Sequence, residues 1–153
     1  MRNEKSVDAL NKLVVINNDR IEGYQTAVED TDEQDLKTMF TQFAQASHKY
    51  KQELANEINS LGGAPSDGTR NTGKLFRAWM DVKAALTGKD REAILNSCEF
   101  GEDKALEAYE DVLKNDTEHL SPKHISLVNT QMSELRKDHN KVKSMRDALK
   151  QHS

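Results

Sequence analysis

Four polar residues interrupt the apolar stripes that recur along this chain in steps of three and four positions. They are Asn17, Ser47, Glu102 and His139, and each falls near the middle of its stripe. Carboxylates and imidazoles at that depth of a four-helix bundle can hold metal ions, as they do in di-iron carboxylate proteins. The identity of these four residues therefore bears directly on function.

The four residues do not match the ligand set of a di-iron centre. Such a centre needs a Glu from each of two helices and a Glu-x-x-His pair from each of two others, because two ions require many anionic oxygens. His48 has Gln45 three positions before it and lies beside its stripe, and His139 has Arg136 at the same spacing. Only Glu102 and His139 remain as core-facing ligands, which are too few for two irons.

On the first predicted helix, Asp19 and Glu22 fall on the outer side by helical period. Three further histidines are expected to be exposed: His119, His124 and His152.

We interpret the four polar residues as one candidate core layer. A buried carboxylate needs hydrogen-bond partners, so we expect Glu102 and His139 to pair with each other. Asn17 and Ser47 would satisfy the remaining polar groups of the layer. Two alternatives stay open: a single metal ion completed by water or by a second chain, and a small-ligand or proton-transfer pocket, since a Glu–His pair can shift both pKa values. No cofactor is predicted.

The stripes that carry these residues predict an all-α fold, a four-helix bundle with one short extra helix. Sustained period-two alternation, which would indicate a strand, is absent from the sequence. The whole chain, residues 1–153, is expected to form a single domain. The expected helices cover about 6–30, 33–61, 73–87, 90–115 and 121–150.

The connection from Gly62 to Lys89 decides the topology. It is too long for a hairpin turn, but it can traverse a bundle whose second helix of about 29 residues is ~43 Å long. A long crossover of this kind gives a ferritin-like arrangement, two antiparallel helix pairs joined across the bundle. Trp79, in the short extra helix, would then cover apolar surface on the outside of the bundle.

Composition excludes several classes of function. The chain has 153 residues, of which 31% are charged, and a net charge of −4, which argues against nucleic-acid binding because no basic surplus is present. No apolar run approaches the ~20 residues of a membrane span, and the first residues show no signal-peptide core. The lone Cys98 is expected to be a small buried thiol. We therefore expect a cytoplasmic protein.

Several short segments between about Asp8 and Leu149 match the pattern of a known family. They are Asn18-Asp19 with Gly23-Tyr24, Leu61-Gly62-Gly63-Ala64-Pro65, Trp79-Met80-Asp81-Val82-Lys83 with Leu86, Cys98-Glu99 with Gly101-Glu102-Asp103 and Tyr109, and His139. In these segments the chain resembles a bacterial family of ferritin-like four-helix-bundle proteins classed as a domain of unknown function. The resemblance implies the ferritin-like topology and a bacterial intracellular protein, and it implies no reaction.

These patterns predict a non-enzymatic ferritin-like bundle that acts through protein–protein or self-association, as a homo-oligomer or with a protein partner. The fold class is compatible with a role in a stress response. The alternative is a metal-binding or redox bundle that uses core Glu102 and His139, with one metal ion at most.

Overall fold

The computed structural model describes residues 2–66 and 91–151, and all regular secondary structure in that part of the chain is helical. The all-α four-helix bundle expected from the sequence is thereby confirmed. The expected short helix at 73–87, with Trp79, lies outside the described residues. The helices are α1 (Arg2–Asp30), α2 (Gln34–Ser60), α4 (Arg91–Asn115) and α5 (Pro122–Gln151), with a 3-10 turn, η1, at Thr117–His119.

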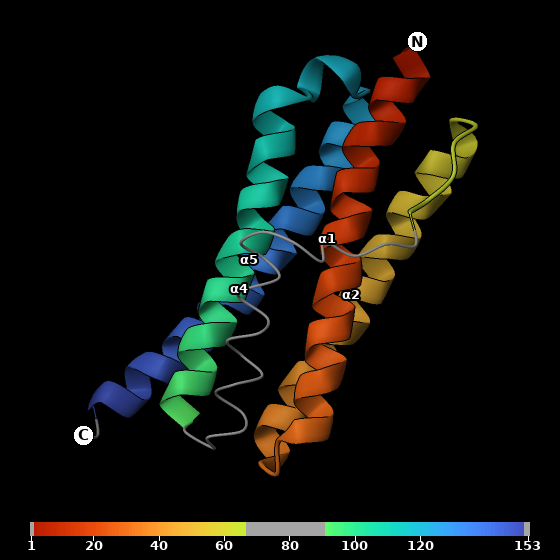
Figure 1. The fold of residues 1–153 in the computed structure, drawn as a ribbon. Helices are drawn as coiled ribbons and strands as arrows, with labels where there is room; N and C mark the ends of the chain where they lie inside the picture. Colours follow the sequence, from red (N-terminus) through yellow and green to blue (C-terminus); the bar gives the residue numbers. More distant parts are fainter. Residues whose placement is uncertain (1, 67–90, 152–153) are drawn as a thin grey trace.

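The four helices form two antiparallel hairpins, α1 with α2 and α4 with α5 (Figure 1). The last turn of α2 returns to the start of α1, where Asn3 Nδ2 donates to the carbonyl oxygen of Leu61 at 3.4 Å. The start of α4 instead lies beside the start of α2, where Arg91 Nη2 and Asp35 Oδ2 are 2.5 Å apart. Because α2 and α4 begin at the same end of the bundle, the end of α2 and the start of α4 lie at opposite ends of it (Figure 1).

A glycine pair ends α2 and lets it approach α1 closely. Gly62 has φ +83°, a left-handed conformation that glycine adopts without steric cost and that commonly terminates helices. A Cβ atom at Gly63 would lie 2.7 Å from both γ-methyl groups of Val7. Any side chain at this position would therefore force Val7 or the chain around Gly63 to move.

The residues after α2 lie along a side of α1 that the sequence predicted to be outer surface. Asn18 Nδ2 donates to the carbonyl oxygen of Ser66 at 3.2 Å, and the Ser66 N–H donates to Asn11 Oδ1 at 2.8 Å. Asp19, which follows Asn18, is only 7% exposed, so its predicted outer placement is wrong. Glu22 is exposed as expected.

The apolar core is divided into two clusters along the bundle. The cluster nearer the N-terminus is built from Ala9, Leu10, Leu13, Val14, Ile16, Tyr50, Leu54, Ile58, Ala105, Leu106, Tyr109, Val112, Leu120, Val128 and Leu135. The other is built from Tyr24, Ala27, Leu36, Met39, Phe40, Phe43, Ala44, Ile94, Leu95, Cys98 and Val142. Buried polar residues separate the two clusters, and among them Arg20, Ser47 and Glu102 are each 0% exposed.

Among residues 2–66 and 91–151, none of the helices combines the length and the apolar composition that a membrane span requires.

Candidate functional site: a buried polar layer

The centre of the polar layer is an ion pair between α1 and α4. The side chains of Arg20 and Glu102 are both fully buried, and Nη2 of Arg20 lies 2.8 Å from Oε1 of Glu102. Nε of Arg20 donates to the same oxygen at 3.2 Å. Two N–H groups of one guanidinium therefore serve a single carboxylate oxygen. This pairing offsets the cost of removing both charges from water, which is several kcal/mol per ion.

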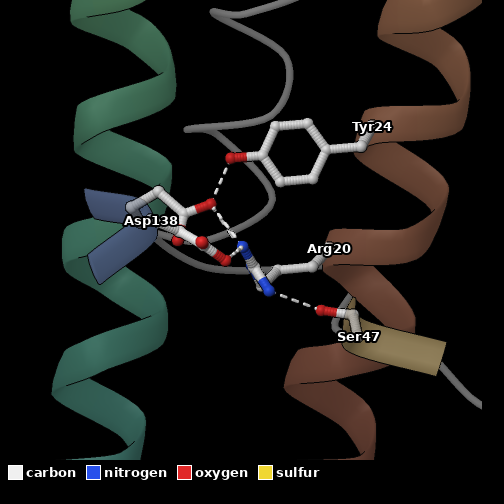
Figure 2. A network of polar contacts seen from close by, with 5 residues as sticks. Arg20, Tyr24, Ser47 and Asp138 are labelled. Carbon is white, nitrogen blue, oxygen red and sulfur yellow. Dashed lines mark hydrogen bonds and ion pairs between the residues drawn. The ribbon is translucent and has the colours of Figure 1, made fainter. Parts of the chain in front are cut away.

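Side chains from the other two helices complete this layer (Figure 2). Nη1 of Arg20 donates to the Ser47 hydroxyl of α2 at 2.6 Å, and Nη2 lies 3.5 Å from Oδ2 of Asp138 on α5. The hydroxyl of Tyr24, one turn beyond Arg20 on α1, donates to Oε1 of Glu102. Each of the four helices thus contributes at least one side chain to a single network.

Aromatic rings enclose the guanidinium. The Cζ atom of Arg20 lies 5.4 Å from the centre of the Tyr24 ring and 5.9 Å from that of Phe43. Tyr24 stacks on Phe40 with ring centres 5.5 Å apart and meets Phe43 edge to face at 5.2 Å. The rings keep water out and attract the cation through their π-faces.

The layer keeps one fixed positive charge at neutral pH. Burial on its own would lower the pKa of Arg20, but the carboxylate of Glu102 and its other partners raise that pKa overall. Burial, followed by the charge of Glu102, raises the pKa of the Tyr24 hydroxyl and of the Cys98 thiol, so both stay protonated. Burial also raises the pKa of Asp138 to about 6, although the guanidinium of Arg20 acts in the opposite direction.

A second hydrogen-bonded set lies next to this layer and also joins all four helices. Asn17 Nδ2 donates to the Tyr109 hydroxyl at 2.8 Å, and that hydroxyl donates to Gln131 Oε1 at 2.7 Å. Nε2 of Gln131 donates to the Tyr50 carbonyl oxygen at 3.1 Å and lies 3.2 Å from Oε1 of Glu53. These bonds satisfy polar groups that would otherwise be costly to bury.

The four polar residues singled out from the sequence do not form one layer. Asn17, Ser47 and Glu102 are each 0% exposed, but Asn17 belongs to the second set. The side chain of His139 is 16% exposed and contacts Asp103, not Glu102. The predicted Glu102–His139 pair is therefore wrong, because Glu102 takes its hydrogen bonds from α1 instead.

Sequence reasoning missed Arg20 and Asp138, although a signal for each was present. Arg20 follows Asn17 by three positions and precedes Tyr24 by four, so it lies on the same helical face as both. Asp138 follows the buried Leu135 by three positions, so it lies on the inner face of α5. In each case the neighbouring residue, Ile21 or His139, is more apolar or a more typical metal ligand, so the pattern favours that neighbour.

His124 is a further correction, because the sequence predicted it to be exposed. It is only 6% exposed, and its Nε2 lies 3.0 Å from Oε1 of Glu57 on α2. The carboxylate of Glu57 also lies 3.3 Å from the Lys123 ammonium. This cluster ties the start of α5 to α2.

The layer is poorly suited to a metal ion. Oε1 of Glu102 already accepts hydrogen bonds from Arg20 and Tyr24. Its other oxygen, Oε2, has no hydrogen-bond partner among the described residues, and it offers only one ligand atom. A divalent cation at that oxygen would face the charge of the buried guanidinium, and like charges repel strongly in a low-dielectric interior.

Comparison with known proteins places the chain in a family. No curated protein matches it. A family profile described as a domain of unknown function matches residues 5–115, a stretch that contains Arg20, Ser47 and Glu102 and ends before α5. Because this match covers well over half of the chain, the protein belongs to the family Domain of unknown function (DUF2383).

Proposed function

We propose that this protein is a non-enzymatic, ferritin-like helical bundle with no metal ion in its core, and that it acts through association with a protein partner or a second copy of itself. The observation that carries the proposal is the fully buried Arg20 guanidinium on Glu102. It supplies positive charge from the protein itself, at the depth where di-iron bundles hold their ions.

The charges of the layer support a structural role for it. Arg20 is the one cation of the network, and Glu102 and Asp138 are its two anionic partners. Buried ion pairs and hydrogen bonds of this kind favour one arrangement of the helices over others. In this proposal, the layer fixes the register of the four helices and performs no reaction.

The ferritin-like assignment is part of the proposal. It is supported by the two antiparallel hairpins and by the common end at which α2 and α4 begin. The bacterial and cytoplasmic setting belongs to the proposal as well, supported by the sequence resemblance and by the buried Cys98 thiol.

The association part of the proposal is supported by one surface residue. Phe100 on α4 is 44% exposed, the one exposed large hydrophobic side chain among the described residues. The ammonium of Lys104 lies 5.1 Å from the centre of its ring. Aromatic residues are enriched in interfaces, where their rings bury much area at low entropic cost.

Light scattering after size-exclusion chromatography tests this part. We expect the full chain to run above the mass of one 17.3 kDa chain at high concentration, and Phe100→Ser to shift it to the monomer. Leu127→Ser, at a partly buried position packed against the core, is a poorer choice because it would also perturb folding. A monomer at every concentration would contradict self-association.

The metal-free core is tested with ferrous iron and air on protein purified without a metal-affinity tag. We expect no iron oxidation above that of the buffer, in the wild type and in Glu102→Gln alike. The His139→Ala variant lacks the imidazole outside the core. The same measurement on this variant therefore distinguishes an ion bound at the surface from one bound in the core. Stoichiometric iron that persists in His139→Ala and disappears in Glu102→Gln would contradict the proposal.

A further inference from the structure

A group of metal-ligand residues lies outside the core, between α4 and α5. Glu99 and Asp103 are four positions apart on α4 and so share one helical face. His139 of α5 lies against them, and one potential ligand atom from each of the three residues lies within 4.8 Å of the others. The group thus combines one imidazole nitrogen with two carboxylate oxygens.

The imidazole has its Nε2 atom directed at both carboxylates. Nε2 of His139 lies 2.6 Å from Oδ1 of Asp103 and 3.8 Å from Oε1 of Glu99. Its other ring nitrogen, Nδ1, lies 3.3 Å from the side-chain oxygen Oδ1 of Asn140. An amide oxygen only accepts hydrogen bonds, so the tautomer with its proton on Nδ1 can donate to Asn140 and turns the lone pair of Nε2 toward the carboxylates. In that tautomer three lone pairs converge, an arrangement that a bound cation would stabilise.

The residues around this group resemble the outer shell of a metal site. The remaining oxygen of Glu99 is held by Nη1 of Arg146, which fixes the carboxylate with Oε1 toward His139. The charge of Arg146 is shared with Asp147, whose Oδ1 lies 3.0 Å from Nη2. Metal-binding histidines usually donate their second ring N–H to an oxygen, and metal-binding carboxylates usually accept a further hydrogen bond.

We propose that Glu99, Asp103 and His139 bind a single divalent transition-metal ion of the zinc type. Zinc takes nitrogen and oxygen ligands in a tetrahedron with bonds of about 2.0–2.1 Å, which separates ligand atoms by roughly 3.3 Å. The separations of 2.6 Å and 3.8 Å from Nε2 lie on either side of that value, so small side-chain rotations suffice. The Asp103 side chain is 48% exposed, which leaves the fourth position open to water.

This site is independent of the core. Its three ligands are distinct from Arg20, Ser47 and Glu102, and the proposed function requires only that the core carry no metal. The bound ion would hold α4 against α5 from outside.

Titration calorimetry with Zn²⁺ on the full-length, untagged chain tests the site. We expect one ion per chain, and a loss of affinity of roughly 10–100-fold or more in Asp103→Asn and in His139→Ala. His48→Ala is the matched control, because His48 is an exposed histidine on α2, and it should bind Zn²⁺ as the wild type does. Glu102→Gln should also bind normally, which separates this site from the core. Substitution with Co²⁺ should give the visible absorption of a tetrahedral ion.

Circular dichroism of each variant shows whether its helices remain intact before affinities are compared. Equal affinities in His139→Ala and His48→Ala would overturn the proposal, because binding would then be non-specific. An absence of saturable binding to the wild type would overturn it too, and the three residues would form only an ion pair.

Discussion

Removal of the buried cation should destabilise the bundle more than neutralisation of its main carboxylate partner. In Arg20→Met, an unbranched apolar chain replaces the guanidinium, and Glu102 is left buried with the Tyr24 hydroxyl donating to it. In Glu102→Gln, the guanidinium keeps the Ser47 hydroxyl at 2.6 Å and the carboxylate of Asp138 at 3.5 Å. The difference arises because the cation has two anionic neighbours, whereas Glu102 has one cationic neighbour.

The expected magnitudes follow from the burial of both groups. Breaking a buried ion pair by removing one partner costs about 3–5 kcal/mol, which we expect for Arg20→Met. Loss of hydrogen bonds to a charged group costs about 1.5–3 kcal/mol, which we expect for Glu102→Gln. In the double variant Arg20→Met with Glu102→Leu, both charges leave together. Its cost should therefore fall below the sum for Arg20→Met and Glu102→Leu by at least about 2 kcal/mol.

Urea unfolding followed by circular dichroism at neutral pH gives the free energy of unfolding of each variant. A domain of this kind has a total stability of about 5–15 kcal/mol, so Arg20→Met leaves a measurable folded population unless the wild type is at the lower limit. Arg20→Lys, which keeps a charge but loses the fork of N–H groups, serves as a milder variant. Additive losses in the double variant would refute the ion-pair reasoning, as would a Glu102→Gln cost equal to that of Arg20→Met.

Three other variants or reagents probe the same region. Burial raises the pKa of Asp138 from 3.8 to about 6, so the folded chain holds this proton more tightly than the unfolded chain. The resulting stabilisation is present below pH 3.8 and lost as the pH rises through about 6. In urea titrations at several pH values, Asp138→Asn should lack this pH dependence, which is worth at most about 3 kcal/mol in the free energy of unfolding. Parallel pH profiles of the wild type and Asp138→Asn would contradict the expectation. Because burial raises the pKa of the Cys98 thiol, an aromatic disulfide reagent should label it quickly only in urea, and fast labelling of the native chain would be the contrary result. Tyr109→Phe removes the hydroxyl that bridges two buried amides. We expect the free energy of unfolding in urea to fall by about 1–3 kcal/mol. An unchanged urea midpoint would show that the bridge contributes nothing to stability.

The helices and the buried positions of Asn17, Ser47 and Glu102 could be read from the sequence because local periodicity determines them. Ser47 stands between Phe43 and Tyr50 at steps of four and three, so any helix that buries the two rings also buries the hydroxyl. Glu102 likewise stands between Cys98 and Ala105, at steps of four and three. In both cases the apolar neighbours define one inner face, and the structure places these side chains at 0% exposure.

On α1 and α5, the sequence allowed two inner faces that differ by a rotation of one residue. Steps of three and four connect Asn17 to Tyr24 through either Arg20 or Ile21. Hydropathy favours the isoleucine, yet the arginine is the more deeply buried, at 0% against 8% exposure. On α5, the same ambiguity led to His139 instead of Asp138.

Only the tertiary structure resolved this ambiguity, because burial of a charge depends on its partner. Arg20 would be very costly to bury alone, and Glu102, which makes the burial acceptable, is 82 residues away in the sequence. The contact between His139 and Asp103 likewise depends on how α5 is rotated against α4. Helical period is a property of each segment, whereas the pairing of charges is a property of the packed helices.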